Sequence, residues 1–443
     1  MLTRKVYQQK AFYYLDNAAT TPLSHEALEA MVPYLTEDFG NASTIYTLGQ
    51  RAKQALEESR RTIAETIGAK PQEIYFTSGG TESDNWALVS AMVSGRQRLL
   101  HEAIQRDPDA IVNGHLITDK IEHHAILRTC KYLESLGFDI TYLDVDSKGH
   151  VDPRDVEAAI RPDTILISVM MANNEIGTLE PVTEIGRVAH DHGILFHTDA
   201  VQAYGHIPIQ VGEMNIDLMS ASAHKLNGPK GVGFLYMRRG VNLKSFMHGG
   251  AQERGFRAGT ENVAGIVGFA RAAETACASL RARNIREQQV RDHLIARLTR
   301  GVKFAWLNGD PVDRLPNNIN ITFQYIEAET LLLLMNEKKI YASAGSACAS
   351  GSLEPSHVLL ALGVSREDAL GSIRLSIDPD LSIEDADYLV DTLKPMIERL
   401  RRQSSRYLEA IGELPETDAE EPEANAAGAA DAVDTEDAGG ALN

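Results

Sequence analysis

An alternation of short β-rich runs with longer helical stretches, from residue 16 to about residue 260, most limits how this chain can fold. Strands that alternate with helices pair in parallel, because each crossover returns the chain to the same edge of the sheet. The pattern predicts an α/β fold with a large, mostly parallel seven-stranded sheet. Its predicted strands are residues 74–77, 115–118, 140–145, 164–170, 194–198, 217–220 and 232–237.

Helix signals separate several of these strands. Asp152 before Pro153 predicts a helix start, and Gly68 and Gly193 predict helix ends. The predicted helices of this region are residues 49–67, 78–93, 125–136, 153–160 and 183–192.

After Val263 the pattern changes to that of a smaller α+β domain. A long helical region runs to about Leu298, and Ser382 with Asp385 predicts the start of the last helix. The remaining predicted elements are strands 319–323, 340–343 and 372–377 and helices 329–337 and 384–401. We expect a large domain over residues 16–262 and a small domain over residues 263–405 together with residues 1–15.

Charge is concentrated at the C-terminus. The formal net charge is -19, and residues 413–443 hold ten acidic residues and no Lys or Arg. This composition predicts a disordered, solubilising tail, with a docking segment for a basic partner as the alternative. So acidic a chain is a poor nucleic-acid binder.

Composition also limits the compartment. The sequence contains no run of 18 apolar residues, so we expect no membrane span. Its N-terminus has no apolar stretch typical of a secretory signal. Cys130, Cys277 and Cys348 are widely spaced and include no CxxC pair. This favours a reducing cytoplasm over a disulfide framework, and predicts no metal site.

Two residues predict the chemistry. Asp199 ends an apolar strand, and Lys225 follows on a later loop between small polar residues and a Gly-Pro turn. Pyridoxal 5'-phosphate requires this layout, in which a lysine forms the Schiff base and an aspartate faces the pyridine nitrogen. A helix cap or turn role is the alternative for Asp199 alone. Gln202 could contact the ring hydroxyl, or be an ordinary polar residue at a helix start.

A phosphate group would need a binding site lined by N–H and hydroxyl donors. Residues 78–83 follow a strand and open a helix, so unpaired backbone N–H groups and the Thr81 hydroxyl would attract a phosphate there. Ser222 and His224 flank the lysine and add donors. A glycine turn such as Gly79-Gly80 is common, and it indicates a phosphate site only in combination with Lys225 and Asp199.

Three further residues, His123, Cys348 and Arg374, each have a functional interpretation and a purely structural one. His123 could stack on a coenzyme ring, but spacing does not separate it from His124. Cys348 lies among small residues, which predicts an exposed thiol on a mobile loop, either a nucleophile or a bystander. Arg374 interrupts an apolar strand, where a guanidinium binds a carboxylate or forms an internal salt bridge.

Several motifs resemble the NifS/IscS-type cysteine desulfurases, which are fold-type I pyridoxal-phosphate enzymes. The resemblance covers residues 13 to about 402 and is jointly specific. Its motifs are residues 14–21 (YLDNAATT), 77–83, 173–177 (NNEIG), Asp199 with Gln202, 222–225 (SAHK), 248–260 (HGG to RAGT) and 345–357, in which Cys348 runs into SLEPSH.

The resemblance implies a role for each matching residue. Lys225 would be the Schiff-base lysine, His123 the ring-stacking acid/base and Cys348 the nucleophile that holds sulfur as a persulfide. The implied coenzyme contacts are Gly80, Thr81, His123, Asn174, Asp199, Gln202, Ser222, His224, Lys225 and, from the other subunit of a homodimer, Thr260. Asn17, Asn174 and Arg374 would bind the substrate.

The implied reaction converts L-cysteine to L-alanine and passes sulfur to an iron–sulfur scaffold or a tRNA-thiolation protein. Cys348 would then contact an iron–sulfur cluster on the partner transiently. A selenocysteine lyase or another fold-type I enzyme is the alternative, and a non-catalytic sulfur-delivery scaffold is an alternative of another class. Ala42, Tyr46 and Ala344 depart from the family pattern, as does the acidic tail.

Overall fold

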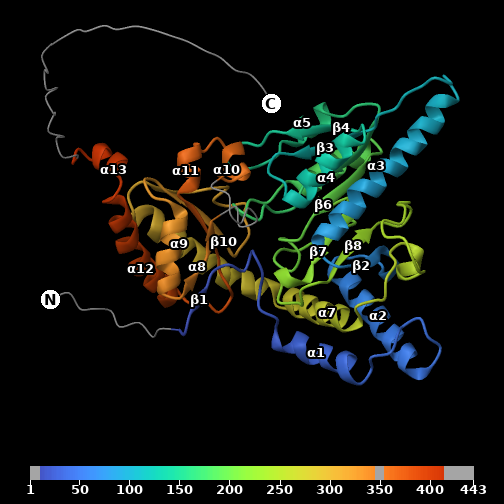
Figure 1. Cartoon of the computed structure of the whole chain (residues 1–443), viewed down its shortest axis with the longest axis horizontal. Helices are drawn as coiled ribbons and strands as arrows, with labels where there is room; N and C mark the ends of the chain where they lie inside the picture. Colours follow the sequence, from blue (N-terminus) through green and yellow to red (C-terminus); the bar gives the residue numbers. More distant parts are fainter. Residues whose placement is uncertain (1–9, 345–353, 414–443) are drawn as a thin grey trace, which may run out of the picture.

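A seven-stranded sheet forms the core of the larger part of the molecule (Figure 1). The structure is a computed structural model that describes residues 10–344 and 354–413. The strand order is β2-β8-β7-β6-β5-β3-β4, and β8 runs in the direction opposite to the other six strands. The mostly parallel sheet is therefore confirmed. Its strands are β2 (Ile74–Thr77), β3 (His115–Asp119), β4 (Asp139–Leu143), β5 (Thr164–Ser168), β6 (Leu195–Asp199), β7 (Leu218–Ser222) and β8 (Gly233–Met237).

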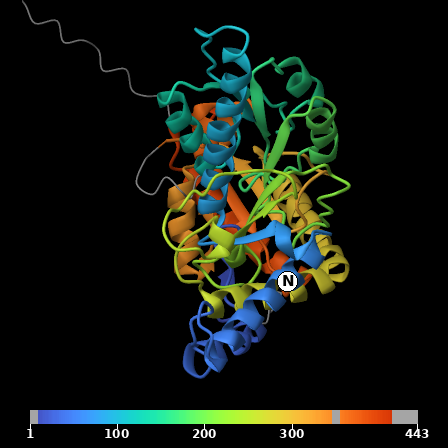
Figure 2. The ribbon, with the colours of Figure 1, turned by 90° about the vertical axis from the view of Figure 1, so that its right-hand side faces the viewer.

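Helices cover both faces of this sheet, because its side chains alternate between them. Ile74 and Phe76 belong to one apolar core, and Tyr75 belongs to the other. The first core includes side chains of α2 (Thr47–Thr66), α5 (Pro153–Ala158), α6 (Val182–Asp191) and α7 (Val263–Ala278). The second includes α3 (Gly80–Ile104) and α4 (His124–Ser135). Helix α1 (His25–Thr36) packs on α7 at the outer edge (Figure 2).

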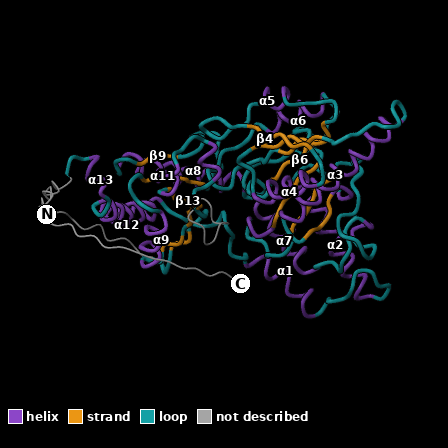
Figure 3. The backbone as a smooth tube through the Cα atoms, turned by 45° about the horizontal axis from the view of Figure 1, so that its top comes forward, coloured by secondary structure: helices purple, strands orange, loops and turns teal. Residues whose placement is uncertain are grey.

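A smaller unit is built on a four-stranded sheet of order β12-β13-β10-β9, separate from the large sheet in Figure 3. Its strands are β9 (Ala305–Leu307), β10 (Asn318–Phe323), β12 (Ser343–Ala344) and β13 (Ser372–Ser376). A short parallel pair, β1 (Tyr13–Tyr14) with β11 (Ile340–Tyr341), lies beside it. Its helices are α8 (Leu280–Gly301), α9 (Ala328–Glu337), α10 (His357–Ala361), α11 (Arg366–Leu370), α12 (Ile383–Arg401) and α13 (Ser405–Ala410).

The chain passes from the larger unit to the smaller unit close to residue 279. The long helical region is two helices, since α7 and α8 meet at Ser279 with a bend of 71°. The buried side chains of α7 lie in the core of the large sheet. The boundary after residue 262 stays a prediction, and the packing favours a later one. No single described helix is long and apolar enough to cross a membrane.

Candidate coenzyme and substrate site

Most of the candidate residues follow the C-terminal ends of neighbouring parallel strands. Lys225 closes a 3-10 turn directly after β7, and Asp199 is the last residue of β6. His123 follows β3 and caps α4, and Asn174 lies on the loop after β5. Because parallel strands end at the same edge of a sheet, these residues gather where open α/β sheets bind ligands.

The segment Asp16–Thr21 crosses this edge and contacts both units. The Lys225 ammonium donates to the carbonyl oxygens of Ala18 at 2.6 Å and Ala19 at 2.9 Å, and the Gln202 amide donates to Ala18 at 2.9 Å. On the other side, the Asn17 amide donates to the Ser376 carbonyl oxygen of β13 at 2.9 Å. The segment thus connects the candidate lysine with the small sheet.

Asp199 is a buried carboxylate in an acidic surrounding. Burial raises its pKa to about 6, against the opposing effects of the Val201 N–H, 2.8 Å from Oδ1, and of Lys225. Burial also raises the pKa of Asp84 and of Glu122 well above their usual values, and Asp199 adds to both shifts. Oxygens of Asp84 and Glu122 have no hydrogen-bond partner among the described residues. A cationic ring nitrogen would offset the negative charge of ionised Asp199.

Two candidate histidines are held neutral. Burial, and to a smaller extent the nearby Lys225 ammonium, lower the pKa of His123 to about 4. His123 Nδ1 accepts from the Ala125 N–H at 3.1 Å, so the ring proton is on Nε2. Burial likewise lowers the pKa of His224 to about 4, and its Nδ1 lies 3.1 Å from the Thr20 hydroxyl. Both rings are therefore neutral near pH 7.

The donors that a phosphate needs are grouped at the start of α3. Gly79 has φ +154° and caps this helix, a conformation that favours glycine. The first N–H groups of a helix have no partner within it, so those near Gly80 point outward. Thr81 lies in the first turn of α3, and the Ser222 hydroxyl would lie 3.7 Å from a Cβ built at Gly79. With Lys225 and Asp199, this donor set fits pyridoxal phosphate.

Arg374 approaches the site from β13 of the small sheet. It is buried, and its guanidinium donates to the Asn174 carbonyl oxygen at 2.9 Å and to Asp16 Oδ1 at 2.9 Å. Its Nε is a buried donor with no partner among the described residues. A buried, unused donor of a guanidinium is suited to an anionic ligand.

Some candidates lie apart or outside. Thr260 is exposed on the loop before α7, and Cys348 lies outside the described residues. Cys130 and Cys277 are on helices, as predicted, and burial raises both pKa values. Sequence reasoning missed several groups that the fold adds to the site. They are Asp16, Asp84, Glu122, His206, Ser343 and His357; of these, only Asp16 and His357 lie in motifs quoted from the sequence.

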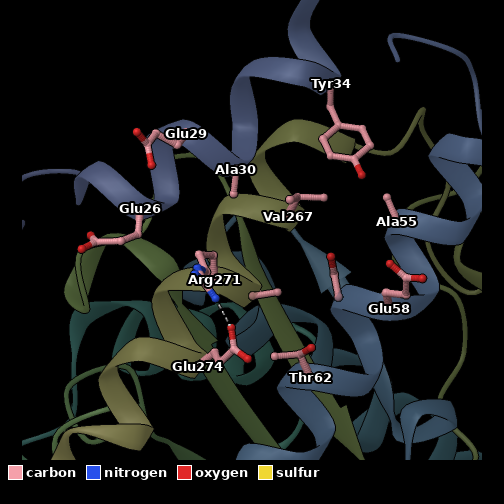
Figure 4. A pocket seen from close by; sticks show the side chains of 12 residues that line it. Glu26, Glu29, Ala30, Tyr34, Ala55, Glu58, Thr62, Val267, Arg271 and Glu274 are labelled. Carbon is pink, nitrogen blue, oxygen red and sulfur yellow. Dashed lines mark hydrogen bonds and ion pairs between the residues drawn. The ribbon is translucent and has the colours of Figure 1, made fainter. Parts of the chain in front are cut away.

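A separate cavity of about 430 Å³ lies between α1, α2 and α7 (Figure 4). Glu26, Glu29, Glu58 and Glu274 line it, with Arg271 paired to Glu274 at 2.6 Å. None of the candidate residues borders it, so we do not assign the chemistry to this cavity.

Comparison with known proteins shows the family of this chain. The sequence pattern of the aminotransferase class-V family matches residues 13–389. A cysteine desulfurase IscS of Methanosarcina thermophila is 52% identical over 391 residues, which are 88% of this chain and 93% of that protein. This chain belongs to the NifS/IscS-type cysteine desulfurases of the aminotransferase class-V family.

Solved structures of this family share the fold. A NifS-like protein is 36% identical with a TM-score of 0.79, and the match covers 88% of this chain and all of that one. The structure of SspA in complex with cysteine is also 36% identical, with a TM-score of 0.70 over 83% of this chain and 99% of that one. The predicted fold-type I architecture is confirmed.

Proposed function

We propose that this protein is a pyridoxal-phosphate-dependent cysteine desulfurase that converts L-cysteine to L-alanine and holds the sulfur as a persulfide on Cys348. The observation that carries the proposal is that the segment Asp16–Thr21 contacts both Lys225, which lies beside Asp199 at the edge of the large sheet, and Arg374 of the small sheet. The curated relatives named cysteine desulfurase and the solved complex with cysteine support the same activity.

Each residue has a proposed task. When bound, the coenzyme supplies an electron-poor ring that accepts an electron pair from the substrate α-carbon. The Lys225 amine would hold the coenzyme at its aldehyde carbon, and the Asp199 carboxylate would hold a proton at the ring nitrogen. The phosphate would be held by Gly80, Thr81, Ser222, His224 and the partner subunit's Thr260, and Gln202 would contact the ring hydroxyl. His123 would lie against the ring and move protons.

The substrate side has its own set. Arg374 binds the α-carboxylate, and Asn17 and Asn174 line the same space. The Cys348 thiolate attacks the substrate sulfur, so that an S–S bond forms as the substrate C–S bond breaks. The electron pair of the C–S bond stays with carbon, which takes a proton and becomes the methyl group of alanine. The products are L-alanine and the Cys348 persulfide.

The proposal extends to partners. An acceptor protein, either an iron–sulfur scaffold or a tRNA-thiolation protein, takes the sulfur, and Cys348 contacts an assembling cluster only transiently. We propose a homodimer because α1 exposes Leu28, Val32 and Leu35 on one side. The spaced cysteines favour the cytoplasm, and the negative charge argues against nucleic acid as a partner.

Sulfide and alanine formation from L-cysteine with dithiothreitol tests the function. Lys225→Ala should abolish both, whereas Lys131→Ala, an exposed lysine paired with Glu134, should keep both. Cys348→Ala should lose sulfide release, with Cys277→Ala as its control. Unchanged alanine formation by Cys348→Ala would remove the persulfide step, and activity on selenocysteine alone would favour a lyase. Loaded protein with no turnover of either amino acid would favour the scaffold.

A further inference from the structure

The guanidinium of Arg374 is held on two sides by groups of the protein. Its Nη2 donates to Asp16 Oδ1 at 2.9 Å and to the Ser343 hydroxyl at 3.0 Å. The same hydroxyl donates to Asp16 Oδ1 at 2.9 Å, which closes a ring of three hydrogen bonds. On the opposite side, Nη1 donates to the Asn174 carbonyl oxygen.

This ring is built from three separate segments. Ser343 pairs directly with Arg374 across β12 and β13, and Asp16 comes from the N-terminal segment, which forms a bridge with Ser376 of β13. The Arg374 side chain is 3% exposed and that of Asp16 is 20% exposed. An ion pair so shielded, with a second hydrogen bond to each partner, has one geometry rather than many.

The ring leaves part of the guanidinium available. An arginine has five N–H donors, and the hydrogen bonds above use three of them. The buried Nε is among those that remain without a partner in the described part of the chain. A long, flexible side chain that is fixed in this way presents its unused donors in a set direction, without the entropy cost of ordering it on binding.

We infer that Asp16 and Ser343 are positioning residues that fix Arg374 and thereby make the site select ligands with an α-carboxylate. The inference rests on the proposed role of Arg374. Asp16 and Ser343 would act through the guanidinium, which both of them contact. Glu175 also lies near Arg374, but the Ser356 hydroxyl binds its carboxylate and no hydrogen bond joins it to the guanidinium.

Two inhibitors that differ only in a carboxylate provide the test. L-Alanine and ethylamine are assayed against sulfide release by the holoenzyme, and the ratio of their inhibition constants measures recognition of the carboxylate. Asp16→Asn should raise the inhibition constant of alanine about tenfold and leave that of ethylamine within twofold. Ser343→Ala should raise it about threefold, and Ser343→Thr, which keeps the hydroxyl, should restore it.

The controls separate positioning from charge and from misfolding. Glu175→Gln removes a neighbouring charge without breaking a bond to Arg374, and should leave the ratio within twofold. A distorted site would weaken both inhibitors together, which would contradict the inference. Tighter alanine binding by Asp16→Asn would show that Asp16 competes with the ligand, and would also contradict it.

A variant of Arg374 itself distinguishes a failure of the proposed function from a failure of the inference. If Arg374→Lys leaves the ratio unchanged, the role of Arg374 itself is wrong and the inference falls with it. If Arg374→Lys collapses the ratio whereas Asp16→Asn and Ser343→Ala do not, only the positioning role is wrong.

Discussion

Individual buried residues hold the candidate lysine in place as much as its own contacts do. His206 is one of them, since its Nε2 lies 3.0 Å from the Lys225 carbonyl oxygen and its Nδ1 lies 3.4 Å from the Asn317 amide. A carbonyl only accepts, so Nε2 holds the proton; the Asn317 amide nitrogen only donates, so Nδ1 has none and the ring is neutral. Burial lowers the pKa of His206 from 6.5 to about 4, in agreement with that state.

Replacement of His206 should therefore have an effect on stability that depends on pH. At pH 7.5, His206→Gln should lower the free energy of unfolding by about 1 kcal/mol, because it loses the bond to Lys225. Below pH 6.5 the unfolded wild type gains a proton that the folded protein takes up only near pH 4. The wild type should thus lose about 2 kcal/mol relative to the variant by pH 5. Urea denaturation at the two pH values measures this, and an equal difference at both would contradict the neutral ring.

Asp199 should govern affinity for the coenzyme. Asp199→Asn removes the carboxylate that would pair with a cationic ring nitrogen, so the dissociation constant of pyridoxal phosphate should rise at least tenfold. An absorbance titration of the protein freed of coenzyme gives this constant. Asp144→Asn, on an exposed residue paired with Lys120, is the control. Equal affinity in both variants would remove Asp199 from the coenzyme site.

At the scale of elements, a buried ion pair attaches α2 to the loop before α7. Arg60 forms two bonds of 2.8 Å to the Glu253 carboxylate, which also accepts from the Phe76 N–H of β2 at 3.0 Å. Both side chains are at most 5% exposed. Glu253 and Arg254 have φ of 43° and 60°, so this pair stabilises a strained turn close to the loop of Thr260.

Loss of one partner of this pair should be costly. Arg60→Ala leaves the Glu253 carboxylate buried without its cation, and should reduce the free energy of unfolding by about 3–5 kcal/mol. Arg51→Ala breaks a surface pair with Asp38 and should change it by less than about 1 kcal/mol. Chemical denaturation of both variants compares the two. Similar small losses would show that the Arg60–Glu253 pair contributes little.

The elements also show where sequence reasoning stops. The strands of the large sheet were predictable because each is a short apolar run between turn residues. Helix α3 extends to Ile104 instead of ending near Val93, and Gly95 lies inside it because a Cβ there would clash with the Ile165 side chain. The predicted strand 340–343 is two short strands, β11 and β12, in different sheets. The pairing partners of β11 and β12 depend on tertiary contacts, which the local sequence does not predict.

The same limit applies to the site. Lys225, Asp199 and the turn before α3 were predictable, since each stands at a strand end or a helix start. The Asp16–Ser343–Arg374 ring was not, because 327 positions separate Asp16 from Ser343. Likewise, no local pattern brings His206 to the Lys225 backbone.

At the scale of the whole molecule, the exposed apolar side of α1 continues into the following loop. Leu35 and Phe39 are 60% and 67% exposed, and Ile45 is 94% exposed. Apolar surface of this kind is usually covered by another chain. In the proposed homodimer, the second subunit covers it and brings its own Thr260 to the coenzyme.

Charges on this surface should separate the subunits. The double variant Leu35→Asp and Phe39→Asp should sediment as a monomer and should bind pyridoxal phosphate more weakly than the wild type. Leu333→Asp, on the exposed side of α9, should remain a dimer, since Leu333 is 68% exposed in the other unit. A dimer that persists in the double variant would place the interface elsewhere.

The most direct test of the central claim is the site of covalent attachment of the coenzyme. Borohydride reduction of the protein loaded with pyridoxal phosphate, followed by proteolysis and mass spectrometry, locates the modified amine. We expect a single reduced adduct, on the Lys225 side chain. An unmodified Lys225 in fully loaded protein, or an adduct on another lysine, would contradict it.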